Sequence, residues 1–76
     1  MVSVARRLIQ FNLDIDMARN LEYEHGYRHG YELAQFYGLE DPKRNIRSRG
    51  ISLRSVYAVG FLCGHRDRKN GLPCKY

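Results

Sequence analysis

The chain has 76 residues and a net charge of +5, so it is expected to form one small domain, residues 1–76, that buries a modest fraction of its surface. Its two cysteines, Cys63 and Cys74, are too few for a secreted disulfide scaffold, and no apolar run is long enough for a signal peptide or a membrane span. We therefore expect a protein of the reducing cytoplasm.

Residues 1–16 are predicted to form a β-strand or an extended segment. Apolar and polar side chains alternate over residues 9–16, which is typical of a half-buried strand. The same stretch also has apolar residues at helical spacing, namely Leu8, Phe11 and Ile15. Whether residues 8–15 are strand or helix therefore stays open. A lone strand leaves its backbone groups unpaired, so a strand here predicts a homodimer that pairs through residues 8–15.

A first helix is predicted over residues 17–37. Asp14 or Asp16 can cap its start, and Gly38 is a typical C-terminal stop. A basic linker is predicted over residues 38–51, with a turn at Asp41 and Pro42.

A second helix is predicted over residues 52–70. Ser52 is the expected N-cap, and Gly71 and Pro73 end the helix before a short tail, residues 71–76. The predicted fold is therefore mainly α: an N-terminal strand or extension, then two helices joined by a basic linker.

A Tyr-x-x-Gly-aromatic-x-x-Gly segment occurs once in each predicted helix, at residues 23–31 and again at 57–65. Each glycine inside a helix costs about 1 kcal/mol relative to alanine, so close packing must offset about 4 kcal/mol. Glycines four residues apart share a helix face and let two backbones approach. We expect the helices to pack through these residues: Gly26, Gly30, Ala34, Gly60, Gly64, Tyr27 and Phe61. The tyrosines could alternatively stack on unpaired bases.

Basic residues concentrate in the second half of the chain. Residues 1–41 carry a net charge of −3, whereas residues 42–76 carry +8. Cations at this density bind the phosphates of nucleic acids. The candidate nucleic-acid-binding residues are Lys43, Arg44, Arg47, Arg49, Arg54, Arg66, Arg68 and Lys69. Alternatively, the acidic and basic halves face each other, and Arg66, Arg68 and Lys69 complement a helix dipole.

Catalytic motifs are not found, so we expect a binding protein rather than an enzyme, without a cofactor. His25 and His29 have the i, i+4 spacing of many metal-binding histidines. Cys63, His65 and Cys74 could complete a zinc site, but no Cys-x-x-Cys is present. No metal site is predicted, and zinc binding by these five side chains stays open.

The helical segments resemble the ribosome modulation factor family over about 45 residues. The similar residues are the Gly26-Tyr27-x-x-Gly30 segment, the turn at Pro42 and the Tyr57-x-x-Gly60-Phe61 segment. The resemblance implies two short helices with a basic connection, and binding to ribosomal RNA that inactivates the ribosome. The linker here is longer, and Tyr57 and Phe61 stand where that family has tryptophans.

Residues 10–13, Gln-Phe-Asn-Leu, resemble the strand of Arc-type ribbon-helix-helix repressors. That resemblance implies a dimeric ribbon that enters the DNA major groove, with Gln10 and Asn12 reading bases. Asp14 stands where that family has a basic residue.

The sequence thus predicts a small protein that binds structured RNA or the ribosome and modulates its activity. One alternative is an inhibitor of the mobile-element type that binds and blocks a host protein. A further alternative is a dimeric ribbon-helix-helix-like repressor.

Overall fold

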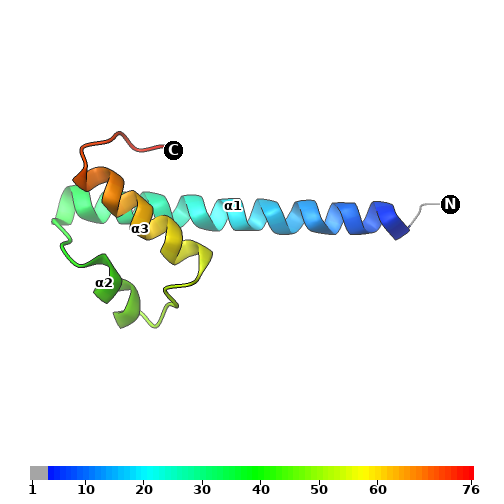
Figure 1. Cartoon of the computed structure of the whole chain (residues 1–76), viewed down its shortest axis with the longest axis horizontal. Helices are drawn as coiled ribbons and strands as arrows, with labels where there is room; N and C mark the ends of the chain where they lie inside the picture. Colours follow the sequence, from blue (N-terminus) through cyan, green and yellow to red (C-terminus); the bar gives the residue numbers. More distant parts are fainter. Residues whose placement is uncertain (1–3) are drawn as a thin grey trace.

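Three helices form the described part of the chain: α1 (Val4–Tyr37), α2 (Pro42–Ser48) and α3 (Val56–Lys69). The structure is a computed structural model that describes the backbone of residues 4–76 and the side chains of residues 17–76. α3 lies across the C-terminal part of α1, and α2 lies beside the first half of α3 (Figure 1). The prediction of a mainly helical fold is confirmed, and the described backbone contains no strand.

The expected N-terminal strand is not found, because α1 begins at Val4 and its backbone is helical over residues 8–15. A continuous helix satisfies backbone groups within the chain, whereas a lone strand needs a partner. The side chains of residues 8–15, through which a dimer was predicted, lie outside the described ones.

α1 ends at Tyr37, and Gly38 follows with a φ of 59°. The Leu39 N–H then donates at 3.3 Å to the carbonyl of Leu33 in the last two turns of α1, so the chain folds back on the end of the helix. Gly38 therefore acts as the stop that its position in the sequence predicts.

The predicted linker contains a helix of its own, α2. The Asp41 carboxylate accepts the Arg44 N–H at 3.1 Å, and Pro42 occupies the first turn. This is a helix start rather than an isolated turn, because Asp at the N-cap and Pro at the first position both favour helix initiation.

α3 begins one turn later than predicted, with Ser55 rather than Ser52 as its N-cap. The Ser55 hydroxyl accepts the Ala58 N–H at 3.1 Å, so it satisfies one of the free donors of the first turn. Ser52 instead accepts the Arg54 N–H and the Ser55 hydroxyl in the preceding turn. Both serines are reasonable caps in sequence, and the tertiary position of the loop decides between them.

α1 and α3 cross at their glycines. A Cβ at Gly26 would overlap the Tyr57 carbonyl, and a Cβ at Gly30 would overlap the Phe61 carbonyl. Backbone atoms cannot move aside as the end of a flexible side chain can. The contact therefore requires residues without a side chain, and it places glycine Cα hydrogens against carbonyl oxygens.

The crossing is reciprocal. A Cβ at Gly60 would overlap the Tyr23 carbonyl, and a Cβ at Gly64 would overlap the Tyr27 carbonyl. Exchanging each residue for the one 34 positions away converts one set of contacts into the other. The two segments are thus related by an approximate two-fold axis, with fully buried Tyr27 and Phe61 in equivalent places and Ala34 half-buried further along α1.

A small apolar core joins α2 to this helix pair. Ile46 of α2 is fully buried with Ala58 and Phe61 of α3. Half-buried residues of all the surrounding segments pack against them: Leu33, Leu39, Ile51, Leu53, Tyr57 and Leu62. This core fixes α2 against α3.

No helix in the described part of the chain is long and apolar enough to cross a membrane.

Candidate nucleic-acid interface

The cations of α2 form one exposed group, which we call the α2 cluster: Lys43, Arg44 and Arg47. Helical spacing brings Lys43 and Arg44 next to Arg47, at i, i+4 and i, i+3. None of the three forms an ion pair with a carboxylate of residues 17–76. Like charges at this spacing destabilise a helix by a few tenths of a kcal/mol, so the caps and buried Ile46 must hold α2 together.

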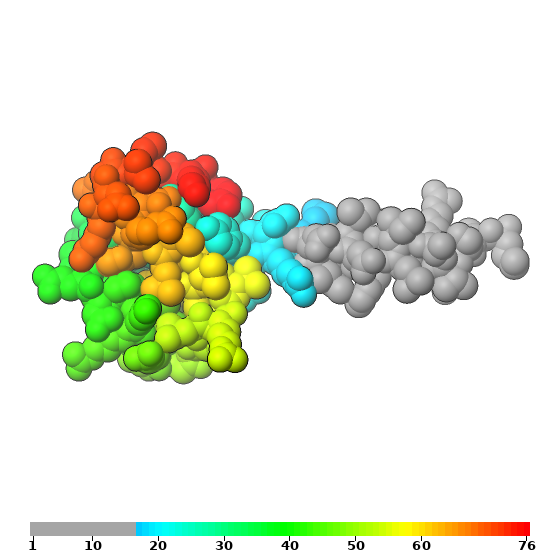
Figure 2. All heavy atoms as spheres, viewed as in Figure 1, coloured from blue at the N-terminus to red at the C-terminus, as the bar shows by residue number. Residues whose placement is uncertain are grey.

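The cations at the end of α3 form a second group, separate from the first. Arg66, Arg68 and Lys69 occupy the last turn, where they complement the helix dipole. Arg66 lies 3.4 Å from the Asp67 carboxylate. In Figure 2, α2 and its following loop lie on one side of the view and the end of α3 on the other. The structure thus divides the predicted binding residues between two surfaces.

Arg49 is exposed, but unlike the α2 cluster its side chain has a hydrogen-bond partner within the fold. It caps α2, and its Nη1 and Nη2 both donate to the Tyr57 hydroxyl at 3.2 Å. Its guanidinium also lies 5.4 Å from the ring centres of Tyr57 and Phe61, in cation–π contact with both. Gly50, with a φ of 71°, then reverses the chain and carries Ile51 over the same tyrosine.

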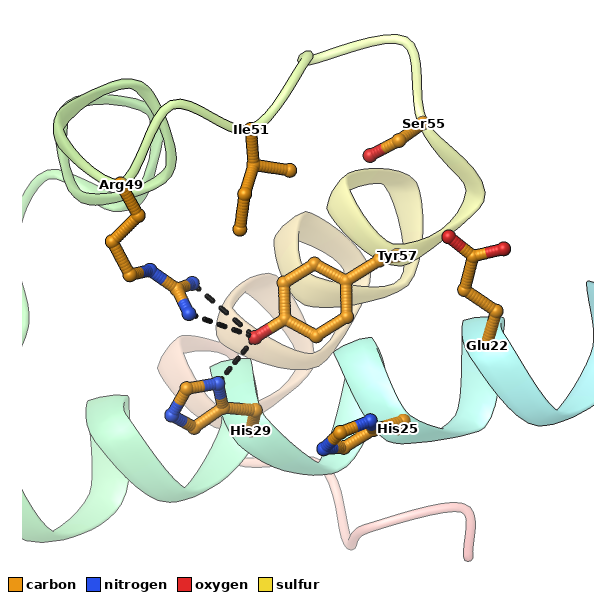
Figure 3. Close-up of a pocket in the computed structure, with 7 residues that line it drawn as sticks. All are labelled: Glu22, His25, His29, Arg49, Ile51, Ser55 and Tyr57. Atoms are coloured by element: carbon orange, nitrogen blue, oxygen red, sulfur yellow. Dashed lines mark hydrogen bonds between the residues drawn. The ribbon is translucent and has the colours of Figure 1, made fainter.

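The Tyr57 hydroxyl links three elements, because it contacts His29 of α1 as well as Arg49 (Figure 3). Partial burial, then the charge of Arg49 and the neighbouring His25, lower the pKa of His29, whereas Glu32 raises it. A neutral His29 accepts a hydrogen bond at Nδ1. The hydrogen bonds therefore run in one direction, from Arg49 to the Tyr57 oxygen and from the Tyr57 O–H to His29.

An open groove of about 540 Å³ lies around this tyrosine. Its lining residues come from α1, the end of α2, the loop and α3: Glu22, His25, His29, Arg49, Ile51, Ser55 and Tyr57. Arg49 and His29 lie at one end, and Glu22 and Ser55 at the other, with the Tyr57 ring between them (Figure 3). We call it the Tyr57 groove.

The five side chains considered for zinc are dispersed. His29 contacts the Tyr57 hydroxyl, whereas the His65 Nε2–H donates to the Leu39 carbonyl at 2.6 Å. Cys63 and Cys74 are free thiols, each half-buried. Among the described residues, no three His, Cys, Asp or Glu side chains are grouped as metal ligands.

On the opposite side of the helix pair, Tyr27 and Asp67 form a buried polar contact. The Tyr27 hydroxyl donates to the Asp67 Oδ2 at 2.5 Å, and Lys75 Nζ lies 3.9 Å from the same oxygen. The hydrogen bond from Tyr27 lowers the pKa of Asp67, burial opposes this, and Lys75 and Arg66 lower the pKa further. This contact joins α1 to α3, and neither Tyr27 nor Asp67 lines the Tyr57 groove.

The sequence predicts only a packing or stacking role for Tyr57, and no motif marks Glu22, Ile51 or Ser55. The spacing of Glu22, His25 and His29 places them on one face of α1, which is a usable signal. Their convergence with Arg49 depends on the chain reversal after α2, which the sequence alone does not fix.

No known protein family, curated protein or solved structure matches this chain. The fold and the groove therefore define the molecule only as a small helical protein with a cationic surface and a mixed aromatic and polar cleft.

Proposed function

We propose that this chain is a non-enzymatic, cytoplasmic RNA-binding protein that binds structured RNA or the ribosome and modulates its activity. The supporting observation is the α2 cluster: three exposed cations on one short helix, without a carboxylate partner among residues 17–76. The cations of the α2 cluster repel one another within their helix. Binding to the phosphates of RNA would be favourable for them, because it releases the counterions condensed on the RNA.

The two surfaces have different roles in this proposal. The α2 cluster and the exposed Arg54 make the main phosphate contacts, and Arg68 and Lys69 add to them at the far end of α3. The likeness to the ribosome modulation factor family supports RNA over duplex DNA. The glycine faces supply the framework, since the backbone contact of α1 with α3 holds the loop and α2 in place.

A second candidate is the inhibitor that binds a host protein. Large apolar side chains are exposed at the end of α1 and in the tail: Phe36 is 69% exposed, Tyr37 78% and Tyr76 50%. Aromatic side chains of this kind are enriched in protein interfaces. The repressor alternative has no support in the fold, because the backbone of residues 10–13 is helical where a ribbon-helix-helix protein has a strand.

The test compares two double variants with equal loss of charge. Arg44→Gln/Arg47→Gln removes two cations of the α2 cluster, whereas Arg19→Gln/Arg28→Gln removes two exposed cations of α1. Binding to a structured RNA is measured at about 50 and about 200 mM salt. Of the two variants, we expect only Arg44→Gln/Arg47→Gln to bind weakly. Its salt slope should be shallower by about 1.4–1.8, at about 0.7 per single-strand or about 0.9 per duplex phosphate contact.

If the two variants bind RNA with the same affinity and salt slope, the α2 cluster is not part of the interface. Failure of the unaltered protein to bind RNA at low salt would refute the proposed function. Nuclease-resistant binding to a host protein, lost on Phe36→Ser/Tyr37→Ser, would instead establish the inhibitor.

A further inference from the structure

The Tyr57 groove has the size and chemistry of a ligand site rather than of a packing defect. Its volume of about 540 Å³ lies within the range of about 300–1,000 Å³ typical of small-molecule pockets. A cationic end, an aromatic middle and an anionic end follow one another along it (Figure 3). That order matches a nucleotide, which carries a phosphate at one end and hydrogen-bonding groups on its base at the other.

The aromatic middle is held in a fixed position. The Tyr57 hydroxyl contacts both Arg49 and His29, and the His25 ring lies edge-on to the tyrosine at 5.7 Å between centres. Ile51 lies over the same ring from the loop (Figure 3). A rigid ring beside an apolar side chain is a surface on which a base can stack without a large loss of conformational entropy.

At the cationic end, Arg49 has more N–H donors than its contact with Tyr57 uses. Arginine has five N–H donors, of which Tyr57 engages only those of Nη1 and Nη2 that point toward it. The Nε–H and a neighbouring Nη N–H of an arginine form a planar fork that can bind two oxygens of one phosphate. The tyrosine contact thus positions the guanidinium before a ligand arrives.

The anionic end of the groove offers hydrogen-bond acceptors that suit some bases better than others. Glu22 is exposed and makes no ion pair with a cation of residues 17–76. An ionised carboxylate only accepts hydrogen bonds, and its two oxygens can accept two parallel N–H groups. Guanine presents two adjacent N–H donors on its Watson–Crick edge. Adenine and cytosine present one amino group beside a ring acceptor, and uracil presents one N–H between two carbonyls.

We propose that the Tyr57 groove binds one unpaired guanine nucleotide of the RNA, with its phosphate at Arg49, its base against Tyr57 and its Watson–Crick edge on Glu22. This inference rests on the proposed RNA-binding function and adds base selectivity to it. The α2 cluster provides the sequence-independent attraction to phosphate, and the groove reads a base exposed in a loop or bulge, as single-stranded RNA recognition commonly does.

The test uses labelled oligouridine strands that differ only at one central position, which is guanine, adenine, cytosine or uracil. Affinities are measured by fluorescence anisotropy for the unaltered protein, for Glu22→Gln and for the control Glu32→Gln. Glu32 is an exposed carboxylate of α1 outside the groove, so both variants lose one negative charge. Circular dichroism verifies that both remain helical.

We expect the unaltered protein and Glu32→Gln to favour the guanine strand by about tenfold or more, the usual range for a bidentate contact to a base. Glu22→Gln should lose this preference while its affinity for the all-uracil strand stays that of Glu32→Gln. Equal binding of all four strands, with the salt dependence on Arg44 and Arg47 intact, would overturn the groove inference and leave the proposed function standing. Absence of binding to every strand would overturn the groove inference, whereas the structured-RNA measurement above tests the proposed function separately.

Discussion

Gly60 shows how one residue can set the distance between two helices. In an isolated helix, changing it to alanine would be favourable by about 1 kcal/mol. In this fold, the added Cβ would overlap the Tyr23 carbonyl, which belongs to the backbone of α1. The two helices would have to separate, and the packing of fully buried Tyr27 and Phe61 would loosen with them.

We therefore expect Gly60→Ala to destabilise the protein by about 1–3 kcal/mol, the range for overpacked cores. Urea unfolding followed by circular dichroism measures the change. Val59→Ala, at the exposed neighbouring position of the same helix, is the control and should leave the midpoint almost unchanged. A midpoint that rises in Gly60→Ala would contradict the close crossing.

The contact between Tyr27 and Asp67 makes stability depend on pH. The Tyr27 hydrogen bond holds the pKa of Asp67 below its usual value of about 3.9, so the folded state binds this proton less readily than the unfolded state. The stabilisation is therefore complete above about pH 4 and is lost as the pH falls through the lowered pKa of the folded state.

Tyr27→Phe should lower stability above about pH 4, and the deficit should shrink as acid removes the same contribution from the unaltered protein. Thermal unfolding across this pH range measures the difference. Tyr31→Phe is a matched control, because the Tyr31 hydroxyl donates at 2.8 Å to the Leu72 carbonyl, which does not titrate. A loss of stability in Tyr27→Phe that does not change with pH, like that of the control, would show that the Tyr27 hydrogen bond does not lower the pKa of Asp67.

At the scale of the elements, α2 is the least supported helix and also the one that carries the proposed interface. It has seven residues, and a helix this short is not stable alone. Its order comes from the Asp41 cap, from Pro42 and from burial of Ile46 against α3. The position of the α2 cluster therefore depends on a few contacts that can be tested singly.

Asp41→Ala removes the side chain that accepts the Arg44 N–H, and we expect it to cost about 1 kcal/mol. Relative to the unaltered protein, Asp41→Ala should speed amide hydrogen exchange in α2 more than in α3. Glu40→Ala removes the same charge from the adjacent exposed residue and serves as the control. If both variants behave alike, the effect is one of charge, and the cap has no measurable role.

The C-terminal ends of α1 and α3 were predictable from the sequence, whereas the start of α1 and the whole of α2 were not. Gly38 and Gly71 mark the ends of α1 and α3, because a positive φ at glycine terminates a helix with little strain. The pattern of residues 8–15 fits both a strand and a helix, and the backbone there is helical. Alternation over eight residues cannot distinguish the two when no partner strand is in the chain.

The site was predictable only in its composition. The density of cations in residues 42–54 is visible in the sequence. That Arg49 contacts Tyr57, whereas Lys43, Arg44 and Arg47 do not, depends on the helix that interrupts the linker. The groove needs α1, α2, the loop and α3 together, so no local pattern could reveal it.

At the scale of the whole molecule, the same helix pair supports two chemically different faces. Tyr57 with His29 and Arg49 faces the groove, while Tyr27 with Asp67 and Lys75 faces the tail. The repeat explains the common framework, since equivalent glycines place equivalent backbone atoms in contact. The function proposed here comes from the residues at which the two copies differ.

The near two-fold relation between residues 23–31 and 57–65 also bears on how the pair assembles. Two identical helices that met in this way would form a dimer whose population depends on protein concentration. Covalent connection through α2 makes the encounter intramolecular, and a short connection corresponds to an effective concentration in the millimolar range. The segment proposed to contact RNA is thus also the tether that keeps the two glycine faces together at any dilution.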